Sequence, residues 1–252
     1  MANYDFPTEI ISLPSQGRCY PESNPLSKGT VEIKYMTAKE EEILASQNLV
    51  RKGVVIDKLF ESIIVDKDIN VDDIVLGDKN AILLATRLLG YGPEYKIEIT
   101  DEYGDPQEVT VDLSKVQTKE IDFDLLSPEN RYEFTTPHGK NKLEFKIITH
   151  GDEKKIDADI KAVQRLNKGG VSAELTTRYR YMILSVDGDT STGAITNFIN
   201  NKFITRDTKA FREYIGKITP DINMEFDYEN PTTGEMEKRP IPMGVGFFWP
   251  TE

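Results

Sequence analysis

The sequence predicts an α+β fold in which helical bundles alternate with β-hairpins. Apolar residues recur at helical spacing over residues 37–90 and again over about 152–218. Elsewhere apolar and polar residues alternate with a period of two around turn-forming residues, at 95–113, 132–147 and 224–242. This order differs from the strand-helix alternation of a parallel doubly wound sheet. A helical bundle followed by a hairpin occurs twice, around 37–112 and around 152–242, which suggests a duplicated architecture.

The 252 residues divide into three parts. Residues 1–30 are expected to form an extended N-terminal arm, and residues 31–126 a helical unit with a hairpin. Residues 127–252 are expected to form a hairpin, a second helical unit and a C-terminal hairpin. Domains usually contain about 100–200 residues, so the two larger parts have the size of ordinary domains.

Proline and glycine recur throughout the arm, at Pro7, Pro14, Gly17, Pro21, Pro25 and Gly29. This spacing is expected to break both helix and continuous strand. The apolar residues of the arm nevertheless need cover from water, and they are Ile10, Ile11, Leu13 and Tyr20. The arm therefore either wraps around its own core or reaches into a neighbouring subunit.

A three-helix unit is predicted after a short strand at 31–35. Thr37 and Glu40 match a capping box, in which the two residues satisfy each other's backbone amides, so a helix is expected over about 38–47. The apolar face of residues 56–64 predicts a second helix. A third is predicted from Asp78 as N-cap to Gly90 as C-cap.

The hairpins at 95–113 and 132–147 come next, and the segment between them is expected to turn Ile121 and Phe123 inward. Four more helices are predicted, the first from about 152, then around 175–183 and 195–199, and the last from Thr205 as N-cap to about 218. The hairpin at 224–242 leads to three adjacent aromatic residues, Phe247, Phe248 and Trp249. These aromatic side chains either pack back on the protein or enter a pocket of a partner.

The composition disfavours nucleic acid and membranes as partners. Forty-three acidic and 31 basic residues give a formal net charge of -12, which repels phosphates and anionic lipid headgroups. No apolar run approaches the roughly 20 residues that span a bilayer, and the first residues lack the pattern of a signal peptide. We therefore expect a protein that folds in the cytoplasm.

The supply of metal ligands is small. One cysteine and two histidines exclude a zinc site of four cysteines, one of two cysteines with two histidines, and a disulfide within the chain. Two segments, beginning at Asp187 and at Asp66, have the first ligand spacing of an EF-hand, but neither has glycine at position 6 or an acidic residue at position 12. Both are interpreted as turns. His138 and His150 are expected to be exposed.

No catalytic residue, cofactor site or metal site is predicted. The segment Gly90-Tyr91-Gly92 follows a helix instead of opening one, so it does not match a phosphate-binding loop. Neither histidine lies near a nucleophile elbow. A pair of carboxylates for glycoside cleavage stays open as an alternative, because 43 acidic residues place some pair at a workable separation.

Several motifs occur in order along nearly the whole chain. They are Leu13-Pro14-Ser15-x-Gly17-x-x-Tyr20-Pro21, Met36-Thr37-Ala38-Lys39-Glu40-Glu41-Glu42-Ile43-Leu44, Asn48-Leu49-Val50-Arg51-Lys52-Gly53, Ile56-Asp57-Lys58-Leu59, Gly77-Asp78-Lys79-Asn80, Thr176-Thr177-Arg178, Arg206-Asp207-Thr208-x-x-Phe211-Arg212-Glu213-Tyr214-Ile215, Pro220-Asp221-Ile222 and Phe247-Phe248-Trp249-Pro250. The ordered set resembles the baseplate hub family of T-even-like contractile-tailed bacteriophages.

The resemblance implies a non-enzymatic protein of the phage tail baseplate, either a structural subunit of the central hub or a factor that assembles it. The implied partners are other hub and tail proteins and a second copy of the chain, without nucleic acid or membrane. The implied location is the host cytoplasm during assembly, and the virion baseplate if the protein is retained. Similar proteins often carry paired cysteines in two hairpin loops, whereas residues 101–104 and 230–234 contain none here, so no zinc is expected in these loops.

We predict partner contacts at both ends of the chain, because apolar anchors often dominate protein interfaces. The predicted contact residues are Ile11, Leu13, Pro14, Tyr20, Phe247, Phe248 and Trp249. The alternative from another functional class is a cell-wall hydrolase associated with the tail, which would use two carboxylates.

Overall fold

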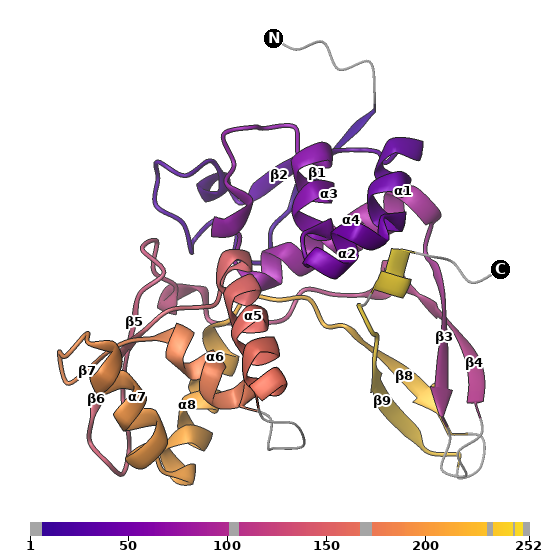
Figure 1. The fold of residues 1–252 in the computed structure, drawn as a ribbon. Helices are drawn as coiled ribbons and strands as arrows, with labels where there is room; N and C mark the ends of the chain where they lie inside the picture. Colours follow the sequence, from indigo (N-terminus) through magenta and orange to yellow (C-terminus); the bar gives the residue numbers. More distant parts are fainter. Residues whose placement is uncertain (1–6, 101–105, 167–172, 231–233, 244, 249–252) are drawn as a thin grey trace.

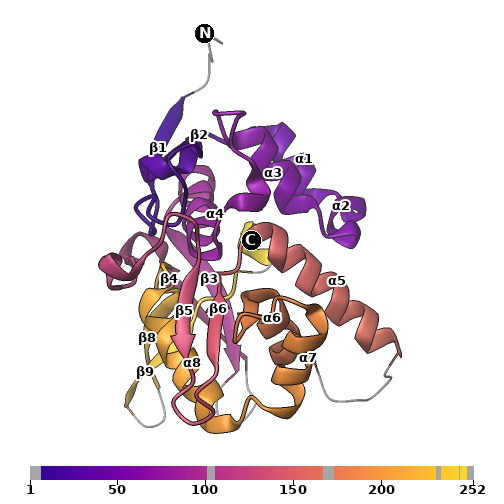
Figure 2. The same cartoon turned by 90° about the vertical axis from the view of Figure 1, so that its left-hand side faces the viewer.

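The computed structural model describes residues 7–100, 106–166, 173–230, 234–243 and 245–248. The fold is α+β, as predicted, with helices and small antiparallel sheets following one another along the chain (Figure 1). The helices α1–α3 lie on one side of α5, and the later helices α6–α8 lie on its other side (Figures 1 and 2). The division into three parts stays a prediction.

The elements up to residue 91 are β1 (Thr8–Ser12), the 3-10 helix η1 (Pro25–Lys28), β2 (Thr30–Lys34), α1 (Ala38–Ala45), α2 (Gln47–Lys52), α3 (Val55–Ile63), the 3-10 helix η2 (Val71–Asp73) and α4 (Leu76–Tyr91). The middle of the chain forms β3 (Glu94–Thr100), β4 (Pro106–Asp112), the 3-10 helices η3 (Leu113–Lys115) and η4 (Phe123–Leu125), β5 (Tyr132–Thr135) and β6 (Lys142–Phe145). The remaining elements are α5 (His150–Leu166), α6 (Glu174–Met182), β7 (Ile183–Val186), α7 (Thr192–Asn201), α8 (Thr205–Ile218), β8 (Glu225–Glu229), β9 (Met236–Pro240) and the 3-10 helix η5 (Val245–Phe248).

All three predicted hairpins form, as the pairs β3–β4, β5–β6 and β8–β9. The strand β7 adds to β6, so β5–β6–β7 is a three-stranded sheet, and β1–β2 is a separate antiparallel pair. The strand β7 was missed because Ile183 continues the apolar stripe of the preceding helix, whereas the structure ends that helix at Met182. Ile121 and Phe123, which were expected to point inward, are only half-buried.

The predicted helix over 38–47 is divided at Ser46 into α1 and α2. At its start Glu40 accepts hydrogen bonds from the amide and the hydroxyl of Thr37, at 2.8 and 2.6 Å. Burial acts to raise the pKa of Glu40, but hydrogen bonds from Lys34, Ser62 and Thr37 outweigh it and lower that pKa to about 2. The carboxylate is thus held ionised at the base of the helix.

The arm contains a strand, so the expectation that its prolines break continuous strand is wrong for Thr8–Ser12. The reason is that Pro7 and Pro14 flank the segment without interrupting it. Beyond this strand the arm folds onto α4: the amide and hydroxyl of Ser15 and the hydroxyl of Tyr20 donate to Asp78, at 2.9, 2.6 and 2.6 Å. Asp78 is therefore not the N-cap of α4; Val75 is, and Asp78 lies in the first helical turn.

The C-terminal segment also packs on α4. Arg87 is buried and donates from Nε to the carbonyl of Phe247, at 2.9 Å, and to the carbonyls of Gly92 and Glu94. The ring of Phe247 meets that of Tyr95 edge-on, with centroids 5.2 Å apart. The helix itself runs to Tyr91 with Gly92 as C-cap, two residues beyond the predicted end at Gly90.

The N-terminal turn of α4 touches the backbone of the chain after α8. A Cβ atom added at Gly77 would lie 1.8 Å from the carbonyl oxygen of Pro220, so only glycine permits this approach. Asn80 adds a hydrogen bond from Nδ2 to Asp221, at 3.0 Å. Buried apolar side chains from both halves, including Leu13 and Phe248, form one continuous cluster with Ile82 and Leu83 of this helix.

We expect Gly77→Ala to lower the free energy of unfolding by about 1–3 kcal/mol or more, because the added methyl group overlaps a backbone carbonyl that cannot move alone. Gly216→Ala is the matched control, since Gly216 also lies in a helix and nothing lies within 4 Å of its added Cβ. Helix propensity predicts that this control is neutral or stabilises by up to about 1 kcal/mol. Urea denaturation of both variants measures the difference, and equal effects would contradict the close approach.

Phe247→Ala is expected to cost about 3–5 kcal/mol of stability, because it empties a buried site in the protein's own core. Ile10→Ala, at an exposed position, is expected to change stability by no more than about 0.5 kcal/mol. Urea denaturation of the two variants and of the wild type tests both expected changes in stability. Wild-type stability in Phe247→Ala would show that this side chain is not part of the core.

Candidate functional site

Five of the seven predicted contact residues lie inside the protein. Leu13, Pro14, Tyr20, Phe247 and Phe248 are buried in the protein's own core, so their contact with a partner stays a prediction. Of the two alternatives for the arm and for the aromatic residues, packing on the protein's own core is the one observed. The physical reason is that α4 supplies both an apolar surface and buried polar partners, Asp78 and Arg87, for the two ends. Trp249 lies outside the described residues.

The predicted contact residue that reaches the surface is Ile11, which is partly buried in β1. Its neighbour Ile10 is 66% exposed, the highest value among the exposed large hydrophobic side chains of the described residues. Both belong to β1, which leads out of the body toward the N-terminal end of the chain (Figures 1 and 2). The strand is therefore a part of the arm whose apolar side chains remain accessible to a partner.

One edge of β1 faces away from the protein. Leu13 donates to Gly29, and Tyr35 donates to Pro7, so the odd-numbered residues of β1 point their backbone groups toward β2. The backbone N–H and C=O groups of the even-numbered residues, Thr8, Ile10 and Ser12, therefore point away from β2. No hydrogen bond to these outward groups is found within the described ranges. The outer side of β2, by contrast, is covered where Val65 donates to Glu32.

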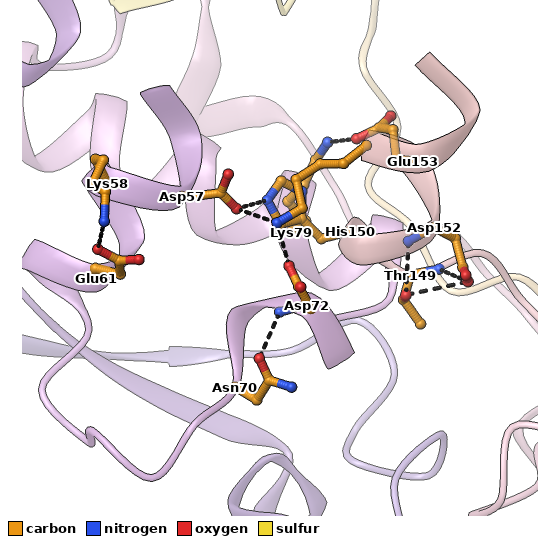
Figure 3. Close-up of polar contacts among 11 residues, drawn as sticks. Asp57, Lys58, Glu61, Asn70, Asp72, Lys79, Thr149, His150, Asp152 and Glu153 are labelled. Carbon is orange, nitrogen blue, oxygen red and sulfur yellow. Dashed lines mark hydrogen bonds and ion pairs between the residues drawn. The ribbon is translucent and has the colours of Figure 1, made fainter. Parts of the chain in front are cut away.

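A second candidate site is a polar cluster between α3, η2 and α5. Asp57 in the first turn of α3 accepts from Nε2 of His150, at 2.8 Å, and from the ammonium of Lys154, at 2.9 Å. The same ammonium lies 2.5 Å from Asp72 of η2. His150 begins α5 and Lys154 is one turn further on, so one helix carries both nitrogen groups. Figure 3 shows Asp57, Asp72 and His150 converging on one point.

His150 is 4% exposed, which contradicts the expectation that it lies on the surface; His138 is exposed, as expected. Burial lowers the pKa of His150, and the positive charges of Lys79 and Lys154 lower this pKa further. Asp57 acts in the opposite direction and raises the pKa. A neutral ring that donates from Nε2 to Asp57 keeps a lone pair on Nδ1, and this assignment agrees with Nδ1 having no partner among the described residues. Asp57 and His150 are 93 positions apart, so no local motif could indicate the pair.

Two ion pairs lie beside the cluster at the start of α5. Lys79 of α4 contacts Glu153, and Lys146 contacts Asp152 at 2.7 Å. Asp152 also accepts from the amide of Thr149, at 3.1 Å, which fixes the beginning of the helix. Together these contacts bind α5 to α4 and to the end of the β5–β6 hairpin.

Asp57, Asp72 and His150 form the group of possible metal ligands found within the described ranges. In the two segments with partial EF-hand spacing, acidic side chains accept hydrogen bonds from the chain itself, and Asp66 accepts from the Asp68 amide at 3.0 Å. Asp187, with a φ of 52°, accepts from the Lys142 amide and from Asn141, and Asp189 accepts from the Ser191 amide. These hydrogen bonds lower the pKa of Asp187 and of Asp189.

A groove lies between the hairpins β3–β4 and β8–β9, and its charged lining residues are Asp112, Lys115, Glu225, Asp227 and Lys238. A glycoside hydrolase needs one carboxylic acid with a raised pKa. The pKa of Asp112 is instead lowered by hydrogen bonds from Ser114. Burial raises the pKa of Asp78, but that carboxyl is 0% exposed and lies away from the groove. The pKa of Asp112 is thus shifted in the direction opposite to the one that a hydrolase acid requires.

None of the helices in the described ranges has the length and apolar character needed to cross a bilayer. No match to this chain was found among curated proteins or among solved structures. A family model described as T4 bacteriophage base plate protein matches residues 8–249. The matched range begins with β1 and extends past η5, so it includes the arm from residue 8, both helical units and all three predicted hairpins. The chain belongs to the family of T4 bacteriophage base plate proteins.

Proposed function

We propose that this chain is a non-enzymatic protein of the baseplate hub, acting as a hub subunit or as a factor that assembles the hub, and that it binds another baseplate protein through the outer edge of β1. The membership of the baseplate family supports a role in the tail. The free edge of β1 is the single observation that carries the mode of binding.

An exposed strand edge is a template for pairing with another chain. In β1 it offers the outward amides and carbonyls of Thr8, Ile10 and Ser12. The exposed side chain of Ile10 adds an apolar contact next to these hydrogen bonds. A partner strand that pairs here would satisfy backbone groups that now face water and would cover Ile10.

The charge of the chain is consistent with this role. A net charge of -12 disfavours binding to nucleic acid, so association with the phage genome would not compete with hub assembly. The partner is another baseplate protein, and a second copy of the chain is the alternative that a sizing experiment distinguishes by mass.

Ile10→Pro tests the edge directly. It removes an outward N–H and leaves the inward hydrogen bonds of β1 in place, because an edge strand accepts proline at such a position. We expect this variant, co-expressed with the other baseplate proteins, to lose the complex in size-exclusion chromatography while it unfolds like the wild type. Ile10→Val is the matched control, since it keeps both the N–H and a branched apolar side chain. Retention of the complex by the proline variant would refute binding through this edge.

Mass spectrometry of purified virions separates the two forms of the proposal. A hub subunit is expected in fixed proportion to the other baseplate proteins, whereas an assembly factor is expected in infected cells and not in finished particles. The measurement is quantification of peptides from this chain against those of a known baseplate protein. A chain that is present in neither baseplate intermediates nor virions would contradict both forms.

A further inference from the structure

We propose that Asp57, Asp72 and His150 bind a first-row transition metal dication such as Zn²⁺, and that the ammonium of Lys154 is the exchangeable cation that holds the site when no metal is bound. One ligand atom from each of the three residues lies within 4.8 Å of the others. This site is separate from the β1 edge, and the inference does not depend on the proposed function.

The donor set indicates the class of ion. Two carboxylate oxygens and one imidazole nitrogen form a mixed set that suits Zn²⁺ and neighbouring transition metals. Mg²⁺ and Ca²⁺ prefer shells made of oxygen alone, so the imidazole of His150 selects against them. The three ligands come from α3, η2 and α5, and the folded protein therefore brings them together before any ion binds.

The charges around the site favour a divalent ion over a single ammonium. Asp57 and Asp72 carry two negative charges, and Lys154 contributes one positive charge between them, at 2.9 and 2.5 Å. A dication in the same place would neutralise both carboxylates. Lys79, the other nearby cation, is paired with Glu153 and does not need to move.

Lys154 can leave the cluster without disrupting the core. Its side chain is 32% exposed and starts from the second turn of α5, so the flexible stem can move the ammonium into water. Asp72 is 50% exposed and lines a surface groove together with Thr149 and Gly151. An ion can therefore reach Asp72 from solvent, and Asp57 and His150 lie directly behind it, within 4.8 Å between ligand atoms.

His150 sets the expected affinity. To bind a metal through Nε2, the ring must carry its proton on Nδ1, and Nδ1 has no acceptor within the described ranges. Ligand histidines usually donate that proton to a second group, and loss of such a partner lowers metal affinity by about 10- to 100-fold. We therefore expect an exchangeable ion bound more weakly than in a dedicated structural zinc site.

The test uses the untagged full chain and ZnCl₂, with equilibrium dialysis for stoichiometry and thermal unfolding as a second readout. Wild-type protein is expected to take up one Zn²⁺ per chain and to unfold at a higher temperature when Zn²⁺ is present. Lys154→Met removes the competing ammonium while keeping a stem of similar length. This variant is expected to bind Zn²⁺ at least tenfold more tightly, and MgCl₂ at the same concentration is expected to have no effect.

Asp72→Asn is the matched loss-of-ligand variant, and its half-exposed position makes a folding defect unexpected. It is expected to weaken Zn²⁺ binding at least tenfold, both alone and combined with Lys154→Met. If Lys154→Met does not fold without metal, recovery of its cooperative unfolding by Zn²⁺ supports the proposal, and failure to recover it counts against the site. Equal uptake by Lys154→Met and the double variant would show binding elsewhere and overturn the proposal, as would no uptake by any variant.

Discussion

The buried carboxyl of Asp78 is the contact on which the arrangement of the chain most depends. It is fully shielded from water and accepts three hydrogen bonds from Ser15 and Tyr20. Removing one partner would leave a buried polar group unsatisfied, at a cost of about 1–3 kcal/mol. Tyr20 in turn accepts from the amide of Val75, so the same network ties the arm to the start of α4. On the same helix, Gly77 lies close to the carbonyl of Pro220, and Arg87 donates a hydrogen bond to the carbonyl of Phe247. Both halves of the chain are therefore attached to α4.

This anchoring determines which surface is left for partners. Because α4 takes up the arm beyond Ser12 and the aromatic segment at Phe247 and Phe248, their apolar side chains stabilise the protein itself. The strand β1 lies before the anchored part of the arm, and its outer edge has no partner within the described ranges. A rigid anchor next to a free edge lowers the ordering cost of strand addition, since β1 is already extended before a partner binds.

The polar cluster at α5 serves the fold in a different way. Asp57, Asp72 and Lys154 are charged groups brought together from distant parts of the chain, and the ammonium compensates the two carboxylates. Such a cluster contributes orientation more than stability, because desolvation of partly buried ions offsets much of their attraction. Its ion pair between Asp57 and Lys154 joins α3 to α5 and sets the direction of α5 relative to α3.

The α+β class, the three hairpins and most of the helices could be predicted from the sequence alone, because these follow from periodicity and turn residues within a few positions of one another. The sequence also indicated the family through its ordered motifs. Which apolar residues are covered became clear from the three-dimensional packing, because Leu13, Tyr20 and Phe247 have the same character whether they fill the protein's own core or a partner's pocket. The packing likewise decided that Asp78 is a buried acceptor instead of a cap and that His150 meets Asp57 across 93 residues. Burial and long-range pairing depend on how elements pack in space, and local spacing carries no information about that packing.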